Sequence, residues 1–399
     1  MDLYLQFGYG MLQHSQELIK LWGGGGVILS PRDLNQTQVV RAAEKLRALG
    51  ATVTIDPQFY LPRADHPRLV KHSYWPESFD TDSFLNGSGL AEMLDGLAAF
   101  YQQAACSLHI IPGLYGQRVD EDWLSVQERV LGEALTRFPA GGRLQTLCLS
   151  ADALRFEEQV QLLLDRAASW SVDGFYVVPE HPGGQYLVDD PMWLANLLDL
   201  CAGLKLLGRR VIVGYCNHQC LCLASANVDA IAAGSWLNVR SFPLGKFRTA
   251  LDDEEKRRAV WYYAPQVLSE FKTPFLDMAF RAGKLDLLRP HPAFQSGFAD
   301  VLFAGAQPTS VRFRETEAHR HYLHCLHQQI AQARRPTYRE TLDGQRAMLA
   351  SAETLLKQAH SLGVRGQHRD FGEFFDVNRS ALDAFDRSRG FVLERQWNA

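Results

Sequence analysis

The chain has 399 residues and a formal net charge of −4, with 46% hydrophobic and 22% charged residues. This length suits one domain of about 250 residues with an extension, and the hydrophobic share supports a large core. The mild charge argues against a broadly basic nucleic-acid-binding surface and against an acidic, disordered chain.

The sequence shows no sign of a membrane protein. No apolar run approaches the ~18 residues of a membrane span, and the first residues lack the basic region and cleavage site of a signal peptide. Seven cysteines are scattered along the chain, which fits reduced thiols. We therefore expect a cytoplasmic protein with no membrane contact.

Eight short apolar runs, rich in β-branched and aromatic residues, predict eight buried strands. Each of these runs except the last is followed by an amphipathic stretch that predicts a helix. A strand–helix repeat implies parallel strands, and eight repeats in about 250 residues predict a (β/α)8 barrel, a TIM-like α/β fold. An open doubly wound sheet is the alternative, but no GxGxxG fingerprint follows a strand. The predicted strands cover residues 3–7, 27–30, 51–55, 107–111, 144–149, 174–178, 210–215 and 228–236.

The strand pattern ends near residue 245. We therefore divide the chain into a barrel over residues 1–245 and a helical C-terminal extension over 246–399. Within the barrel part, a long loop follows the third strand, and loops of that length are usually functional or mobile. The predicted helices of the extension cover residues 252–283, 314–333, 340–363 and 371–388.

Polar residues gather directly after the predicted strands, where parallel α/β folds place their active sites. Asp56 and Glu180 each come just after an apolar run. Carboxylates in such places are partly desolvated, which suits general acid–base catalysis or recognition of an amidine-like ligand edge. The alternative is the ordinary polarity of a barrel rim. His109, His218 and Arg240 also fall in or near strand ends, although His109 sits within its strand and could face the core.

Two clusters contain residue types that bind metals. Cys216, His218, Cys220 and Cys222 lie within seven residues, but they lack the two-pair spacing of common zinc sites. We favour a structural role for this cluster. Four histidines, three of which share one face of a predicted helix, form the second cluster. Without a carboxylate-rich partner helix, a polar helix face is the preferred interpretation. These histidines are His319, His321, His324 and His327.

With the strands placed, the chain resembles the tRNA-guanine transglycosylase superfamily, barrels that handle guanine and 7-deazaguanine bases. The stretch VTIDPQFY (53–60) is similar to the family's D-S-G-G-F-Q segment, with Asp56 at the aspartate and Phe59 near the base-stacking phenylalanine. The stretch VDGFYVV (172–178) resembles the family's D-G-Y/F-x-x-G-G strand.

The last two barrel strands extend this resemblance. VIVGYCN (211–217) is similar to the family's M-G-V-G strand. VDAIAAGSWLNVR (228–240) resembles the motif that follows it, with Asp229 and Arg240 at matching positions. The similarity runs in order over roughly residues 20 to 245.

The chain departs from the family in three places. The family's nucleophilic aspartate falls on Ala232, whose methyl group cannot attack an anomeric carbon. The family's zinc motif after the barrel is absent, because no cysteine lies between Cys222 and Cys325. Pro179 and Glu180 replace its glycine pair. The resemblance therefore implies a base-binding barrel more directly than base exchange on tRNA. It also leaves open a divergent member of the family, such as the transglycosylase-like proteins encoded in bacterial antiviral operons.

A guanine-like base needs acceptors for its N1 and 2-amino donors, a donor for O6, and an aromatic surface. Asp56 and Glu180 are the candidate acceptors and catalytic residues, with Asp56 as general acid or base. Stacking on an aromatic ring contributes about 1–3 kcal/mol per base. The candidate substrate-binding residues are Gln58, Phe59, Tyr60, Tyr115, Asn217, His218, Trp236 and Arg240.

Three functions stay open at this point. The first is a divergent transglycosylase-like protein that binds a guanine or 7-deazaguanine base and transfers or removes it without a cofactor or metal, on an acceptor other than tRNA or on tRNA itself. The second is a metal-dependent barrel hydrolase or isomerase built on Glu180, His181 and His218. The third is a non-catalytic barrel whose helical extension docks a protein partner.

Overall fold

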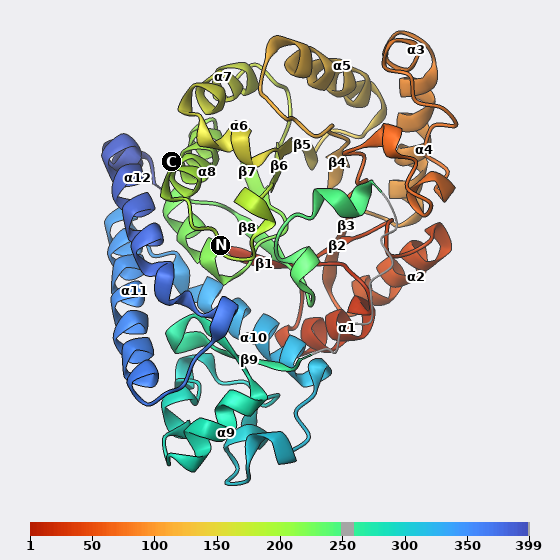
Figure 1. Ribbon diagram of the computed structural model, residues 1–399. Coiled ribbons are helices and arrows are strands. Elements are labelled where there is room, and N and C mark those ends of the chain that lie inside the picture. Colours follow the sequence, from red (N-terminus) through yellow and green to blue (C-terminus); the bar gives the residue numbers. More distant parts are fainter. Residues whose placement is uncertain (249–258, 398–399) are drawn as a thin grey trace.

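The computed structural model describes residues 1–248 and 259–397. Eight parallel strands form one sheet in the order β3-β2-β1-β8-β7-β6-β5-β4, and this sheet curves into a nearly closed barrel (Figure 1). The prediction of a (β/α)8 fold is therefore confirmed. The strands are β1 (Asp2–Gln6), β2 (Gly25–Leu29), β3 (Ala51–Ile55), β4 (His109–Ile111), β5 (Arg143–Leu149), β6 (Gly174–Pro179), β7 (Arg210–Val213) and β8 (Ala230–Ala233).

The barrel closes between β3 and β4, where no regular ladder forms. The amide of Ser107 donates to the carbonyl of Val53 at 3.3 Å. The buried hydroxyl of Thr54 donates to the carbonyl of Leu108 at 2.8 Å. These bonds satisfy polar groups at the seam that the ladder leaves unpaired, as buried backbone groups require.

Helices follow the strands around the barrel, and polar residues cap several of them. Asn35 forms a capping box with Gln38 at the start of α2, and the side chains of Asp120 and Ser150 accept from backbone amides at the starts of α5 and α6. The helices of this part are α1 (Met11–Trp22), α2 (Gln36–Arg47), α3 (Thr81–Asn86), α4 (Gly89–Gln103), α5 (Glu121–Arg137), α6 (Ala151–Arg155), α7 (Glu157–Ala167), α8 (Pro191–Leu206) and the 3-10 helix η4 (His218–Ala226).

The extension begins with a hairpin, and this corrects the prediction of one helix over 252–283. Its strands β9 (Trp261–Ala264) and β10 (Ser269–Lys272) pair in antiparallel register. Pro265 starts the connection, and Leu268 adopts a left-handed conformation with φ of 51°. A proline cannot continue a helix at that point. The expected helix is correct only over α9 (Thr273–Arg281), and residues 252–258 lie outside the described part.

Three longer helices follow, close to their predicted positions: α10 (Glu315–Ala333), α11 (Tyr338–Ser361) and α12 (Phe375–Gln396). Helix α10 contacts α1, η4 and β1. It thus lies where the eighth helix of a (β/α)8 barrel belongs, between the elements that follow β7 and β1 (Figure 1). The C-terminal part of the chain therefore completes the helical ring.

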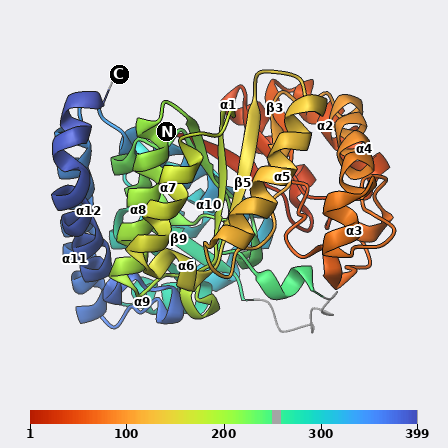
Figure 2. The same ribbon diagram turned by 90° about the horizontal axis from the view of Figure 1, so that it is seen from above.

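Helices α11 and α12 form a second layer outside the ring (Figure 2). Helix α12 packs along α8, and the guanidinium of Arg389 donates to Asp199 of α8 at 2.7 Å. This cover explains why α8 is apolar on all sides, since a helix of that kind must be buried all round. Among the helices of the described residues, none combines the length and apolar character needed to cross a membrane.

The packing of α12 predicts a large effect of truncating its buried face. Leu382 is fully buried, whereas Phe391 on the same helix is 66% exposed. We expect Leu382→Ala to lower the free energy of unfolding by about 2–5 kcal/mol, because it leaves a cavity in the core. Phe391→Ala is the matched control and should change it by less than about 0.5 kcal/mol. Urea unfolding followed by circular dichroism measures both, and an equally small effect of both variants would contradict the packing of α12 on the barrel.

Candidate functional site

A buried carboxylate lies at the carboxyl ends of the barrel strands. Asp56 follows β3 and is fully buried. The hydroxyl of Tyr60 donates to its Oδ2 at 2.6 Å, and the hydroxyls of Tyr176 and Tyr215 donate to the same oxygen at 3.2 Å each. The amide of Gln58 donates to Oδ1 at 2.9 Å. Four donors from the ends of three strands therefore converge on one acidic side chain.

Burial raises the pKa of Asp56 from 3.8 to about 6. The hydrogen bonds from Tyr60, Gln58, Tyr215 and Tyr176 lower this pKa, but they do not offset the loss of water around the charged form. A carboxyl group that titrates near neutral pH can exchange protons under physiological conditions. This property fits the acid–base role expected from the sequence.

A tight turn of the backbone after β3 positions the carboxyl group of Asp56. Gln58 has a left-handed conformation with φ of 54°. Its side chain donates to Ser30 at 2.9 Å and accepts from the amide of Arg32 at 2.9 Å. Gly214 leaves room for Tyr176, because a Cβ atom there would lie 2.5 Å from the tyrosine oxygen. Gln58 is thus occupied in holding the turn.

A hollow of about 530 Å³ opens beside this network. Tyr60 connects the two, since its hydroxyl binds Asp56 and its ring lines the hollow. Phe242 and Phe247 pack edge-on against the ring of Tyr60, with centroids 5.1 and 5.0 Å away. The residues that line the hollow are Tyr60, Leu61, Pro62, Arg63, Ala64, Phe79, Leu114, Tyr115 and Arg248.

Glu180 lies beside this hollow through its contact with Tyr115. The hydroxyl of Tyr115 donates to Oε2 of Glu180 at 2.6 Å, and the amide of Ala151 reaches the same oxygen at 3.3 Å. No described residue donates to the other oxygen, Oε1, and the side chain is only half-buried. Burial and the bond to Glu180 raise the pKa of the Tyr115 hydroxyl well above its ordinary value. Glu180 itself does not line the hollow, but it contacts Tyr115, which does, and it retains one oxygen without a donor among the described residues.

The side chain of Phe59 points in a different direction from that of its neighbour Tyr60. It is 1% exposed and packs against Trp75, Phe79 and Phe84. It does not line the hollow. In this structure it supports the wall behind Phe79 and offers no open face to a ligand.

The other four predicted residues lie between the barrel and the extension. Asn217 donates to the carbonyls of Tyr186 and Arg240 and caps η4. Burial lowers the pKa of His218 to about 4, and its ring is surrounded by aromatic side chains. The indole of Trp236 donates to the carbonyl of Tyr9 at 3.0 Å. The predicted set is therefore divided between the barrel mouth and this junction.

Arg240 belongs to a buried charge cluster at the junction. Its guanidinium lies 3.5 Å from Glu270 of β10 and 3.4 Å above the ring centroid of Tyr322. Arg369 approaches the other oxygen of Glu270 at 3.0 Å, and the hydroxyl of Tyr186 donates to Glu270 at 2.8 Å. The cluster joins the end of the barrel to β10 and to the loop before α12. Sequence reasoning missed Glu270 and Arg369, since a buried ion pair gives no local sequence pattern.

Asp229, which matches the family motif, lies at the opposite end of its strand. It precedes β8 and accepts from Lys205 at 2.8 Å and from the amide of Val211 at 2.7 Å. These bonds fasten α8 and β7 at the amino end of the barrel. Asp229 therefore stabilises the fold at a distance from the mouth.

The two clusters of metal-binding residue types are arranged as packing groups. Cys216, Cys220 and Cys222 are buried free thiols. His321 bonds to the carbonyl of Tyr263 at 2.7 Å, and the indole of Trp22 donates to His324 at 2.9 Å. Within residues 1–248 and 259–397, no three His, Cys, Asp or Glu side chains are grouped to hold a metal ion.

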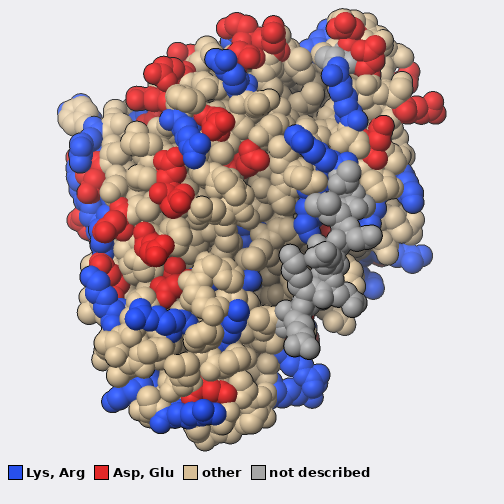
Figure 3. Space-filling model, viewed as in Figure 1, with Lys and Arg blue, Asp and Glu red and all other residues tan. Residues whose placement is uncertain are grey.

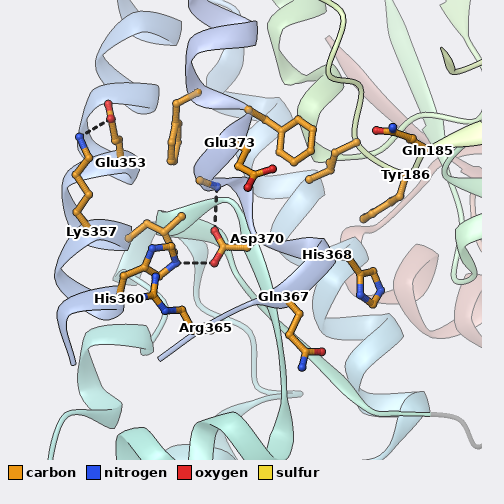
Figure 4. Close-up of a pocket in the computed structure, with 15 residues that line it drawn as sticks. Gln185, Tyr186, Glu353, Lys357, His360, Arg365, Gln367, His368, Asp370 and Glu373 are labelled. Atoms are coloured by element: carbon orange, nitrogen blue, oxygen red, sulfur yellow. Dashed lines mark hydrogen bonds and ion pairs between the residues drawn. The ribbon is translucent and has the colours of Figure 1, made fainter. Parts of the chain in front are cut away.

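A larger groove of about 920 Å³ lies between α11, the loop before α12 and the segment Gln185–Leu187 (Figure 4). Lys357 lies 2.6 Å from Glu353, and His360 lies 2.5 Å from Asp370, whereas Arg365 and Glu373 form no ion pair within the described residues. We place the candidate site at the barrel mouth, because the carboxyl ends of the strands and the buried carboxyl group of Asp56 lie there.

No protein-family model matches this chain, and neither does any curated protein.

The raised pKa of Asp56 predicts a specific pH dependence of stability. Between pH 3.8 and about 6 the folded state binds more protons than the unfolded state, so the free energy of unfolding falls as pH rises. The difference between these two pKa values corresponds to about 3 kcal/mol in the free energy of unfolding. Asp56→Asn removes this titration. Urea unfolding of both proteins at pH 4, 5, 6 and 7 should show wild type losing about 2.4 kcal/mol relative to the variant over this range, and a constant difference would contradict the raised pKa.

The junction cluster predicts that Glu270→Gln is strongly destabilising. The variant leaves the buried Arg240 and the half-buried Arg369 without their carboxylate, and breaking a buried pair typically costs about 3–5 kcal/mol. Asp286→Asn is the control, because its pair with Arg289 is exposed and such pairs contribute about 0–1 kcal/mol. Chemical unfolding at pH 7 measures both changes. Similar small losses in the two variants would show that Glu270 does not hold the extension to the barrel.

Proposed function

We propose that this protein binds a guanine-like base, guanine or a 7-deazaguanine, in the hollow at the mouth of its barrel. The observation that supports this most is the pairing of two aromatic walls with two carboxylates. Tyr60 and Tyr115 line the hollow, and their hydroxyls are fixed by Asp56 and Glu180 respectively. Tyr115 is half-buried and can stack on a flat ligand, whereas Tyr60 is 2% exposed and contributes only a small part of its surface to the lining. A ring held by a hydrogen bond loses little further freedom when a ligand stacks on it.

Glu180 takes the role of acceptor for the base edge. Its Oε1 accepts from no described residue, and guanine presents N1–H and 2-amino donors on one edge. Hydrogen bonds to a charged acceptor contribute about 1.5–3 kcal/mol each. Because Tyr115 and the amide of Ala151 hold Oε2, the carboxylate is oriented before the ligand arrives.

Asp56 lies beneath the proposed ligand and does not touch it. Both of its oxygens accept hydrogen bonds within the protein, so it does not contact the base directly. Its effect on the ligand passes through the Tyr60 hydroxyl, whose orientation depends on the protonation of Asp56. Ala232 stands where the family that the sequence resembles has its nucleophile, so binding is the central part of the proposal.

The other two hypotheses receive less support. Glu180, His181 and His218 do not gather, because His181 bonds to the carbonyl of Gln185 while His218 lies in the aromatic junction. The helical extension is engaged with the barrel, through α10 in the ring and α12 on α8. It is therefore poorly placed to act as an independent docking module.

The proposal predicts that Glu180→Gln weakens guanine binding by about tenfold or more, since the charged acceptor is lost. Isothermal titration with guanine and with hypoxanthine, which lacks the 2-amino group, provides the comparison. Wild type should prefer guanine, and the variant should lose most of this preference. Glu158→Gln, an exposed glutamate on α7, is the control and should bind like wild type. Unchanged guanine affinity in Glu180→Gln would remove Glu180 from the site.

A further inference from the structure

The described residues that line the barrel-mouth hollow include two arginines, Arg63 and Arg248, and no carboxylate. Both arginines are exposed, and the guanidinium of Arg63 lies 5.8 Å from the ring centroid of Phe79, which also lines the hollow. Arginines beside a base site can bind a second, anionic group of the same ligand.

A third arginine, Arg32, lies close to the aromatic side chains beside the hollow. Arg32 is 5% exposed and lies 4.9 Å from the ring centroid of Phe247, the ring that packs on Tyr60. Its Nη2 contacts Asp33 at 3.3 Å, while its buried Nη1 has no hydrogen-bond partner within the described residues. A buried guanidinium with an unsatisfied donor is costly unless a further acceptor is present.

The loop beside the hollow, residues 61–68, also carries arginine side chains. Arg68 donates to the carbonyl of Arg32 at 3.4 Å. Burial lowers the pKa of His66, and the charges of Arg32 and Arg68 lower it further. On the face in Figure 3, several Lys and Arg side chains lie near the hollowed centre, and both signs of charge occur toward the left and upper edges. Within residues 61–68, two arginines thus accompany the single acid, Asp65, on a chain of net charge −4.

From these observations we infer that the ligand is a nucleotide: a guanine-like nucleoside monophosphate whose phosphate binds Arg63 and Arg248 while its base stacks beside Tyr60 and Tyr115. The inference rests on the proposed base site and adds the phosphate to it. Arginine pairs bind phosphate oxygens through parallel hydrogen bonds. A volume of about 530 Å³ suits a single nucleotide, since small-molecule sites span about 300–1,000 Å³.

A free nucleotide is favoured over a nucleic-acid strand by the extent of the cationic region. The cations occupy the segments 61–68 and 246–248 and the buried Arg32. Strand binding depends on neutralising many successive phosphates along a continuous basic track. A site with a few arginines around one hollow matches one phosphate group better.

The test compares guanosine monophosphate, guanosine, ribose 5-phosphate and a short guanine-containing RNA by isothermal titration of the full chain at low salt. The double variant Arg63→Gln/Arg248→Gln is measured beside Arg281→Gln, which removes an exposed arginine on α9. We expect guanosine monophosphate to bind wild type at least tenfold more tightly than guanosine. The double variant should lose this advantage but retain guanosine binding, and Arg281→Gln should behave like wild type.

The outcomes separate the two proposals. Equal affinities for guanosine and its monophosphate in wild type would overturn the phosphate inference and leave the base site standing. A monophosphate preference that survives in the double variant would also overturn it, because the phosphate would then bind elsewhere. Binding of RNA alone would replace the nucleotide by a strand. Binding of ribose 5-phosphate without any guanosine binding would overturn the base site itself.

Discussion

The burial of one ionisable carboxyl group constrains the whole functional end of this barrel. Asp56 has no contact with water, so its charge must be balanced by protein donors or by a proton. Three tyrosine hydroxyls and one backbone amide supply these donors, and they come from the ends of β3, β6 and β7. The barrel interior is polar at this level because the acid is there. Tyr60 connects this network to the hollow, because its hydroxyl binds Asp56 and its ring lines the hollow.

A second buried charge gives the extension its position. Glu270 on β10 is held between Arg240 after β8 and Arg369 before α12. Helix α10 fills the eighth position of the ring, and α12 covers the apolar α8. Barrel and extension are therefore packed into one body by core contacts and by this cluster. The same packing turns the polar residues after β7 and β8 away from the mouth, where barrels of this class often bind ligands.

Much of the fold could be predicted from the sequence. The eight barrel strands are short apolar runs bounded by polar or glycine residues, and each observed strand falls on a predicted one. Three helices of the extension were also located. The hairpin of β9 and β10 was missed because Trp261, Tyr262 and Tyr263 follow a charged stretch that resembles a helix. In fact Tyr262 and Tyr263 are both buried, against His321 and Tyr322 respectively.

The candidate site was predictable only in part. Placement after a strand identified Asp56, Glu180, Tyr60 and Tyr115, because the carboxyl ends of parallel strands meet at one edge. It could not separate Phe59 from Tyr60, whose side chains point in different directions from adjacent positions. The sequence analysis did not identify Tyr176 and Tyr215 as hydrogen-bond donors to Asp56. A tyrosine inside an apolar strand is nevertheless a usable signal, because its buried hydroxyl needs a hydrogen-bond partner.

The most direct test of the buried acid is the protonation of Asp56 itself. Difference infrared spectroscopy of wild type against Asp56→Asn isolates the carbonyl stretch of this one protonated carboxyl group, and its intensity can be followed with pH. We predict that half of the signal is lost near pH 6, the pKa that burial gives Asp56. Loss of the signal near the ordinary value of 3.8 would contradict a desolvated proton-exchanging group beneath the hollow and would leave Asp56 as a structural acceptor alone.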